Sequence, residues 1–413
     1  MLNKISRYAI IVILVVVAAV FLPRFYWKAL GKSTSRPTVY YSPVLDDFVY
    51  SQTGASGVME YQDLSGGSYT IKEYQQLLPF LYARNLEKWG VLPESIKGLP
   101  VTVHFIQKNL QYSRLRPYEL NDPGVALYPL FESESDFTTL EYPNELFRIR
   151  ERMEFITAAT NTVDERLSVL FTEKLESLGF QFPARMIAGN PTNMKPFDEG
   201  YFILDSQNDL FHVKMAKGQP YCVPIPKPAD MDIRYISVTE NPRREFYGLI
   251  LTQADEVYLI MYDAYRLVKL PLVDFDPDEM SFGLLIDPLN STIQYSGKGT
   301  VKTLVTDRAY NVLAENVMHW VTNEEKAVGR IEKYLFPFCL NTRVGNSRFL
   351  HLDFEYYGPH SLFGVLFFLL LFVGIKYYRK EKIGADWFDL VVVASTGIYG
   401  FLAVLLVKTE PWD

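Results

Sequence analysis

The chain has 413 residues, with 41 Lys or Arg against 48 Asp or Glu and a formal net charge of −7. This mildly acidic balance provides no basic field, so we expect no nucleic-acid partner. Aromatic residues make up 15% of the chain, mostly Tyr and Phe, which favours β-sheet surfaces, and the length suffices for more than one folded part.

An apolar run near the N-terminus covers Tyr8–Leu22. It fits either a cleavable signal peptide or a membrane anchor. The nearest small-residue cleavage motif, Val17–Ala19, lies inside the run and more apolar residues follow it, so we favour an uncleaved anchor. We assign residues 1–32 to this anchor, with the span at about 8–22. The aromatic cluster Phe25–Trp27 then fits the membrane–water interface.

The region 33–181 mixes helical and strand patterns, and we expect an extracytoplasmic α+β region. Thr70 and Glu73 fit a capping box, which predicts a helix running toward Gly90 that Pro79 kinks or splits. The residues Val101–Phe105 are typical of a strand.

A second capping box, formed by Thr162 and Glu165, starts the clearest helix outside the apolar segments. Leucine and phenylalanine residues follow at helical spacing, and Gly179 supplies a stop signal. We expect this helix to pack by its apolar face.

The region 182–350 is β-rich, and its short runs repeat. Three runs align with three later runs at one shift of 47 residues: Phe202–Leu204, Leu210–Phe211 and Val223–Ile225 with Leu249–Leu251, Val257–Tyr258 and Leu270–Leu272. A period of this length with several strands is typical of propeller blades. A third, weaker copy runs through Thr292–Tyr295, Val301–Val305 and Tyr310–Leu313. Three copies do not close a ring, so either other strands complete it or the copies form an open stack. Unrelated hairpins in a β-rich domain are the alternative interpretation.

The C-terminal region 351–413 contains two apolar stretches, Leu362–Ile375 and Leu390–Val407. With their flanks they reach the length that crosses the hydrocarbon core, so we predict a transmembrane hairpin with spans at about 360–376 and 390–407. A basic loop joins them: Lys376, Arg379, Lys380 and Lys382. Lys and Arg in short loops stay in the cytoplasm, which places the main domain outside it.

The last apolar stretch carries a face of small side chains, Thr396, Gly400 and Ala403. Such a face allows close helix approach in lipid. Its partner is the preceding span, the N-terminal anchor or another protein.

A search for catalytic motifs returns no phosphate loop, HExxH, GxSxG or paired-Cys motif. Asp274, Asp276 and Asp278 alternate as at the start of a calcium loop, but Glu279 replaces the glycine that such a loop needs. We therefore predict no catalytic, cofactor or metal site and no enzymatic activity. Whether Cys222 and Cys339 pair is open.

Four sequence runs carry a family resemblance: Gly189–Thr192, Asp198–Phe202, Asp209–Met215 and Phe246–Leu249. They resemble an uncharacterised bacterial membrane family classed only as a domain of unknown function, and the resemblance extends over most of the chain, including the three spans. It implies a place near ABC-type transporter genes and supplies no catalytic residues. We interpret the polar members of these runs as turn and blade residues: Asn190, Asp198, Glu199, Asp209 and His212.

These features predict a non-enzymatic, multi-pass protein of the bacterial cytoplasmic membrane with a large extracytoplasmic domain. We expect an accessory or interaction component of an ABC-type transport complex or an envelope complex. Its partners would be membrane lipid and the transporter ATPase and permease subunits. The alternative is an anchored extracytoplasmic protein that binds or senses a ligand, whose identity the sequence leaves unknown.

Overall fold

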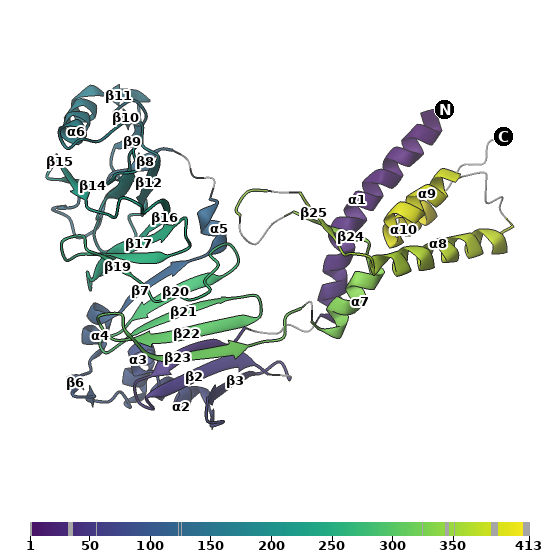
Figure 1. Cartoon of the computed structure of the whole chain (residues 1–413), viewed down its shortest axis with the longest axis horizontal. Coiled ribbons are helices and arrows are strands. Elements are labelled where there is room, and N and C mark those ends of the chain that lie inside the picture. The colour runs from purple at the N-terminus through teal and green to yellow at the C-terminus, as the bar shows by residue number, and fades with distance from the viewer. Residues whose placement is uncertain are drawn as a thin grey trace. The chain divides into compact units, whose positions relative to one another are not determined.

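The structure is a computed structural model that describes residues 2–31, 36–54, 56–122, 124, 126–323, 325–342, 347–350, 352–380 and 387–407. The chain divides into two compact units. Unit 1 comprises Met1–Arg36, Ala55–Gly57 and His319–Asp413, and unit 2 comprises Pro37–Gly54 and Val58–Met318. The larger unit is therefore inserted in sequence between the N-terminal helix and the C-terminal helices (Figure 1).

Unit 2 is built from small antiparallel sheets whose strands mostly follow one another in sequence. The first sheet is β1 (Thr38–Ser42), β2 (Asp47–Thr53), β3 (Met59–Asp63) and β4 (Ser68–Tyr69). Short elements follow it: α2 (Ile71–Gln76), α3 (Pro79–Trp89), β5 (Ser95–Ile96), β6 (Leu99–Pro100), α4 (Val103–Asn109), β7 (Gln111–Leu115) and α5 (Pro117–Leu120). The second sheet is β8 (Tyr128–Pro129), β9 (Glu145–Ile149), β10 (Met153–Thr157) and β11 (Thr162–Asp164), and α6 (Glu165–Ser177) follows it.

Three further sheets follow in sequence. The third is β12 (Met186–Gly189), β13 (Tyr201–Leu204), β14 (Leu210–Ala216) and β15 (Gln219–Ile225). The fourth is β16 (Ile233–Val238), β17 (Phe246–Thr252), β18 (Val257–Met261) and β19 (Leu267–Lys269). The fifth is β20 (Ser281–Ile286), β21 (Ser291–Gly297), β22 (Thr300–Thr306) and β23 (Val312–His319), and β7 pairs with the free edge of β20.

These sheets pack face to face through continuous apolar clusters. The second sheet and α6 share one cluster with the third sheet, the third shares another with the fourth, and the fourth shares the largest with the fifth. The first sheet joins the fifth, where Gln294 Nε2 donates to the Val39 carbonyl at 2.9 Å. Burial of apolar area between neighbouring sheets is therefore the main stabilising contribution in unit 2.

The 47-residue repeat corresponds to equivalent strands in two successive sheets. Its first two runs fall on β13 and β14 in one sheet and on β17 and β18 in the next. The sequence-based prediction of a mixed α+β protein is confirmed, and the structure adds that its strands form small antiparallel sheets. No propeller is detected among the described sheets.

Some sequence signals for helix and strand starts in unit 2 predicted the structure correctly and others did not. Thr70 and Glu73 form the expected capping box, and Pro79 starts a new helix. The strand expected at Val101–Phe105 is wrong, because Thr102 caps α4 by accepting from the Phe105 amide at 3.1 Å. For α6, the cap is Asp164 rather than Thr162.

Unit 1 contains α1 (Leu2–Leu30), α7 (Ala327–Leu335), α8 (Ser361–Tyr378), α9 (Trp387–Thr396) and α10 (Ile398–Leu406). A two-stranded sheet of β24 (Phe338–Asn341) and β25 (Asp353–Tyr356) lies between α7 and α8 in sequence. One apolar cluster joins α1, α8, α9 and α10. Within the described residues, the segments Ile5–Leu30 and Ser361–Tyr378 are long and apolar enough to cross a membrane.

The last apolar stretch is divided, which differs from the single span predicted at 390–407. Gly397 has φ 55°, a left-handed conformation that favours glycine, and it separates α9 from α10. At about 1.5 Å per residue each helix is about 15 Å long, half of the hydrocarbon thickness. The two helices lie against each other as a short helical hairpin (Figure 1).

Candidate functional site

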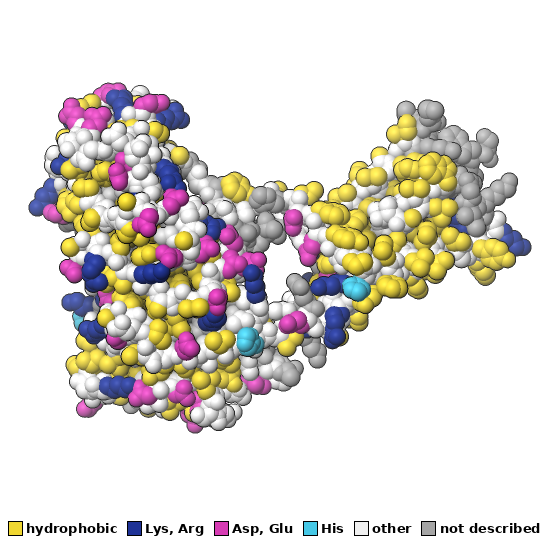
Figure 2. All heavy atoms as spheres, viewed as in Figure 1, with side chains coloured by type: hydrophobic (Ala, Val, Ile, Leu, Met, Phe, Trp, Pro, Cys, Tyr) yellow, Lys and Arg dark blue, Asp and Glu magenta, His cyan; other side chains and the backbone are white. Residues whose placement is uncertain are grey.

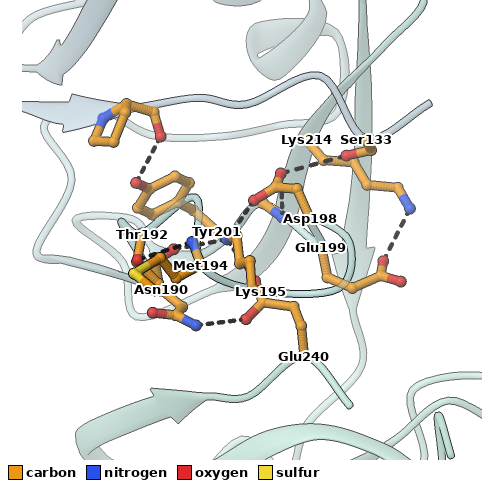
Figure 3. Close-up of polar contacts among 12 residues, drawn as sticks. Ser133, Asn190, Thr192, Met194, Lys195, Asp198, Glu199, Tyr201, Lys214 and Glu240 are labelled. Atoms are coloured by element: carbon orange, nitrogen blue, oxygen red, sulfur yellow. Dashed lines mark hydrogen bonds and ion pairs between the residues drawn. The ribbon is translucent and has the colours of Figure 1, made fainter. Parts of the chain in front are cut away.

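A buried group of charges in unit 2 centres on Lys195, in the loop between β12 and β13 (Figure 3). Its ammonium donates to Asp198 Oδ1 at 2.6 Å, to Glu240 Oε1 at 2.7 Å and to the Asn190 carbonyl at 2.6 Å. The side chains of all three charged residues are at most 3% exposed. The Phe131 ring lies 5.1 Å from the ammonium and covers it. We call this group the Lys195 cluster.

Each carboxylate of the Lys195 cluster has further donors. Asp198 Oδ2 accepts from the Gly200 amide at 2.9 Å, and Glu240 Oε2 accepts from Asn190 Nδ2 at 2.8 Å. Burial raises the pKa of both carboxyl groups above their usual range, and the Lys195 charge opposes that rise. Glu240 comes from the loop between β16 and β17, so the cluster ties two neighbouring sheets together.

A second group centres on His212 of β14, which is fully buried. Its Nε2 contacts the Glu199 carbonyl, and its Nδ1 lies 2.8 Å from the Tyr265 hydroxyl. Because a carbonyl oxygen only accepts, Nε2 carries the proton and Tyr265 donates to Nδ1. Burial lowers the pKa of His212 to about 4, and Phe202 stacks on its ring at 4.5 Å.

The Glu199 side chain faces its own set of partners. Lys214 Nζ lies 3.0 Å from Oε2, and the Tyr262 hydroxyl donates to Oε1 at 3.1 Å. Asp209 lies exposed in the turn between β13 and β14. The structure thus brings Asn190 and Asp198 together in the Lys195 cluster, pairs Glu199 with His212, and leaves Asp209 apart from both.

These arrangements fit a structural role better than chemistry. Every carboxylate oxygen of the Lys195 cluster already has a protein donor, and His212 uses both ring nitrogens on protein partners. A general base must come within hydrogen-bond reach of a substrate proton, and the charged side chains of the Lys195 cluster are at most 3% exposed. The interpretation of these residues as turn and blade residues is consistent with this geometry.

Each of the three alternating aspartates of the calcium-like segment forms an ion pair with a Lys or Arg side chain. Asp274 pairs with Lys302, Asp276 with Lys298 and Asp278 with Arg234, at 2.6 to 3.1 Å. Among the described residues, no group of three or more His, Cys, Asp or Glu is placed to hold a metal ion. Cys222 and Cys339 are both buried free thiols.

Among the described residues of unit 1, a charge pair is buried between the apolar helices. Arg7 of α1 donates to both carboxylate oxygens of Asp389 at 2.9 Å, and its Nε donates to the Val407 carbonyl at 3.1 Å. The side chains are 11% and 2% exposed. Asp389 lies in the first turn of α9 and Val407 follows α10, so both ends of the short hairpin lie at the same end of α1.

The predicted small-residue face is divided between two helices. Thr396 ends α9, whereas Gly400 and Ala403 lie on α10. A Cβ at Gly400 would lie 2.4 Å from Thr396 Oγ1 and 2.7 Å from the Val392 carbonyl. Gly400 therefore lies close to α9. This partner was not predicted, because both segments were expected on one helix.

The predicted basic loop is described in part. Lys376 lies in the last turn of α8, where its ammonium is 5.5 Å from the Phe372 ring, and Arg379 and Lys380 are exposed just beyond the helix. Lys382 lies outside the described residues.

The surface of unit 1 is strongly apolar, as Figure 2 shows over the helices. Side chains of α8 such as Phe363, Phe367 and Leu370 are about two thirds exposed, and α1 exposes Ile13 and Phe25 to a similar extent. Such surfaces suit lipid rather than water. By fold and surface this is a mixed α+β protein with helices suited to a membrane.

The family is identified by residues 38–306, which match the domain of unknown function DUF4857. The chain belongs to this family. Apart from residues 55–57, the matched residues lie in unit 2, and the match does not cover the helices of unit 1 that were predicted as spans. No link to ABC transporters is shown.

No curated protein matches the sequence. One similar solved structure is PorZ, an essential bacterial surface component of the type-IX secretion system of Porphyromonas gingivalis. The identity is 10% and the TM-score 0.22, over 71% of this chain and 34% of that chain. The chain thus spans about a third of the length of PorZ.

Proposed function

We propose that this protein is a non-enzymatic component of a bacterial cytoplasmic-membrane complex. In this proposal the helices of unit 1 insert in the membrane and unit 2 is an extracytoplasmic interaction platform. The observation that supports this proposal most directly is the distribution of side chains in unit 1. The ion pair Arg7–Asp389 is buried, whereas many apolar side chains of the helices are exposed. This distribution is the reverse of that in a water-soluble domain, and it is the one a membrane requires.

The charges at the helix ends support the orientation. Arg7 precedes the apolar run of α1, and Arg379 and Lys380 follow α8, so these basic residues favour the cytoplasmic side. The opposite end of α1 carries Tyr26 and Trp27, which are typical of the interface. Unit 2 continues from that end and is therefore extracytoplasmic in the proposal.

The packing of unit 2 supports a binding role rather than a catalytic one. Its small antiparallel sheets are held together by apolar clusters, and its buried charges bind one another. Stacked sheets present edges and loops in a rigid arrangement, which is a common basis for protein interaction surfaces. We propose an accessory role in a transport complex of ABC type or in an envelope complex.

The test is purification of the full-length protein from its native membrane after mild crosslinking, followed by mass spectrometry. The proposal predicts stoichiometric partners, and ATPase and permease subunits would identify the transport case. A matched sample from cells without the tagged chain corrects for background. Recovery of a stable, solitary protein would contradict the proposal and favour a ligand sensor.

A further inference from the structure

Unit 1 contains a pocket of about 480 Å³ at the end of α1 that follows its apolar run. Arg24 and Trp27 of α1 line one side, and Glu332 and Lys333 of α7 line another. Glu355 of β25 and Tyr357 complete the polar lining used below. This volume is in the range of small-molecule sites in proteins.

The lining carries both signs of charge. Arg24 and Lys333 are basic, and Glu332 and Glu355 are acidic. Arg24 is exposed and donates to the Thr342 hydroxyl at 2.9 Å, which fixes the position of its guanidinium. A lining with two bases and two acids suits a zwitterion better than a singly charged ligand.

Glu332 is the buried member of the set, at 7% exposure. The Tyr357 hydroxyl donates to its Oε1 at 2.9 Å, and the Trp27 indole also donates to the carboxylate. Burial raises the pKa of Glu332 because the carboxylate loses water. A cation in the pocket would restore favourable electrostatic surroundings to the ionised form.

The pocket lies where a membrane surface is expected. The Tyr26 hydroxyl donates to the Val328 carbonyl at 2.8 Å and fixes α7 against the end of α1. On the same stretch of α1, Phe21 and Phe25 are 48% and 60% exposed. Aromatic side chains next to polar groups are typical of the membrane–water interface, where acyl chains meet headgroups.

We propose that this pocket binds the headgroup of a zwitterionic phospholipid that carries a phosphate and a primary ammonium. The phosphate lies at Arg24 and Lys333, because guanidinium and ammonium groups bind phosphate oxygens. The ammonium lies at Glu332 and Glu355. The proposal rests on the membrane insertion proposed above, and it commits to lipid because exposed apolar residues of α1 adjoin the pocket.

The test uses the full-length protein in mild detergent, titrated with short-chain phosphatidylethanolamine and followed by native mass spectrometry. Short-chain phosphatidylglycerol and soluble O-phosphoethanolamine are the comparison ligands. We expect phosphatidylethanolamine to bind tightest. Arg24→Gln and Glu355→Gln should each weaken its binding by about tenfold, since each removes one charged contact. Lys28→Gln is the control, an exposed cation one turn along α1 that does not line the pocket.

Equal binding of both phospholipids, or binding unaffected by the two pocket variants, would overturn the inference. Equal affinity for O-phosphoethanolamine would overturn the lipid assignment. Alkaline carbonate extraction of membranes separates this outcome from failure of the anchoring. A chain that stays in the membrane but shows no headgroup preference refutes the pocket alone, whereas a chain that carbonate releases refutes the proposed insertion.

Discussion

The two units both bury ion pairs, but in opposite settings. In unit 2 the Lys195 cluster lies in the interior of a domain whose core is apolar. In unit 1 the Arg7–Asp389 pair is buried between helices whose exposed side chains are mostly apolar. In both, each buried charge is paired with an opposite charge, which lowers the cost of burying it. The two units therefore bury charges in the same way and differ in their surfaces, because unit 1 exposes apolar side chains on its helices.

The largest expected effect comes from removing the cation of the Lys195 cluster. Lys195→Met keeps the volume but leaves Asp198 and Glu240 buried without their shared partner. Removing one member of a buried pair costs about 3–5 kcal/mol. We expect the free energy of unfolding of unit 2 to fall by that amount in denaturant titrations of the full-length protein.

The matched control for this variant is Lys269→Met, which removes an exposed pair with Glu256. Exposed pairs contribute less than about 1 kcal/mol. Similar losses in Lys195→Met and Lys269→Met would show that the Lys195 cluster does not hold the sheets together.

The Arg7–Asp389 pair provides the corresponding experiment in unit 1. Arg7→Leu leaves Asp389 unpaired and should destabilise the helix bundle by about 3 kcal/mol. The double variant Arg7→Leu/Asp389→Leu should be more stable than the single variant, because no buried charge remains. Thermal unfolding in detergent measures both. A double variant less stable than Arg7→Leu would contradict the pairing.

The pH dependence of unit 2 isolates His212. Its pKa is lowered to about 4 in the folded state from an ordinary value of 6.5. Between these pH values the unfolded chain binds a proton that the folded chain does not, so stability falls as pH falls from about 6.5 to 4. A full proton difference corresponds to about 1.4 kcal/mol per pH unit.

His212→Gln should remove this part of the slope of unfolding free energy against pH. Phe202→Leu is the control, since it removes the stacked ring but keeps the titrating imidazole. We expect it to lower stability and to retain the slope. An unchanged slope in His212→Gln would contradict burial of a neutral histidine.

The smallest effect concerns the short helical hairpin. Gly400→Ala places a Cβ against Thr396 and the Val392 carbonyl, which should cost about 1–3 kcal/mol by overpacking. Gly374→Ala in α8 meets open space and should be neutral or slightly stabilising. Thermal unfolding of both variants in detergent makes the comparison, and equal effects would argue against close packing of α9 on α10.

Patterns within one element were predictable from the sequence. The apolar runs of α1 and α8, the capping box at Thr70 and the repeated strands of the third and fourth sheets all follow from local spacing. The break at Gly397 was not predictable in the same way, because a glycine inside an apolar run fits either a helix or a turn.

The clusters required contacts across distant segments. Asn190 and Asp198 were singled out as turn residues, but Lys195 and Glu240 were missed. Lys195 and Glu240 lie in different loops and are 45 residues apart in sequence. Arg7 and Asp389 are 382 residues apart, and Trp27 and Glu332 meet only in the folded unit. One signal was present in the sequence: opposite charges lie at the ends of two apolar runs on the same predicted side of the membrane.

The most direct test of the account is the side of the membrane on which each unit lies. Asp263→Cys places a thiol at an exposed site of unit 2, and Lys380→Cys places one just after α8. Spheroplasts are treated with a membrane-impermeant maleimide before and after permeabilisation, with the wild-type chain, whose two thiols are buried, as background. The account predicts labelling of Asp263→Cys in intact spheroplasts and of Lys380→Cys only after permeabilisation. Labelling of both in intact spheroplasts, or the reverse pattern, would contradict it.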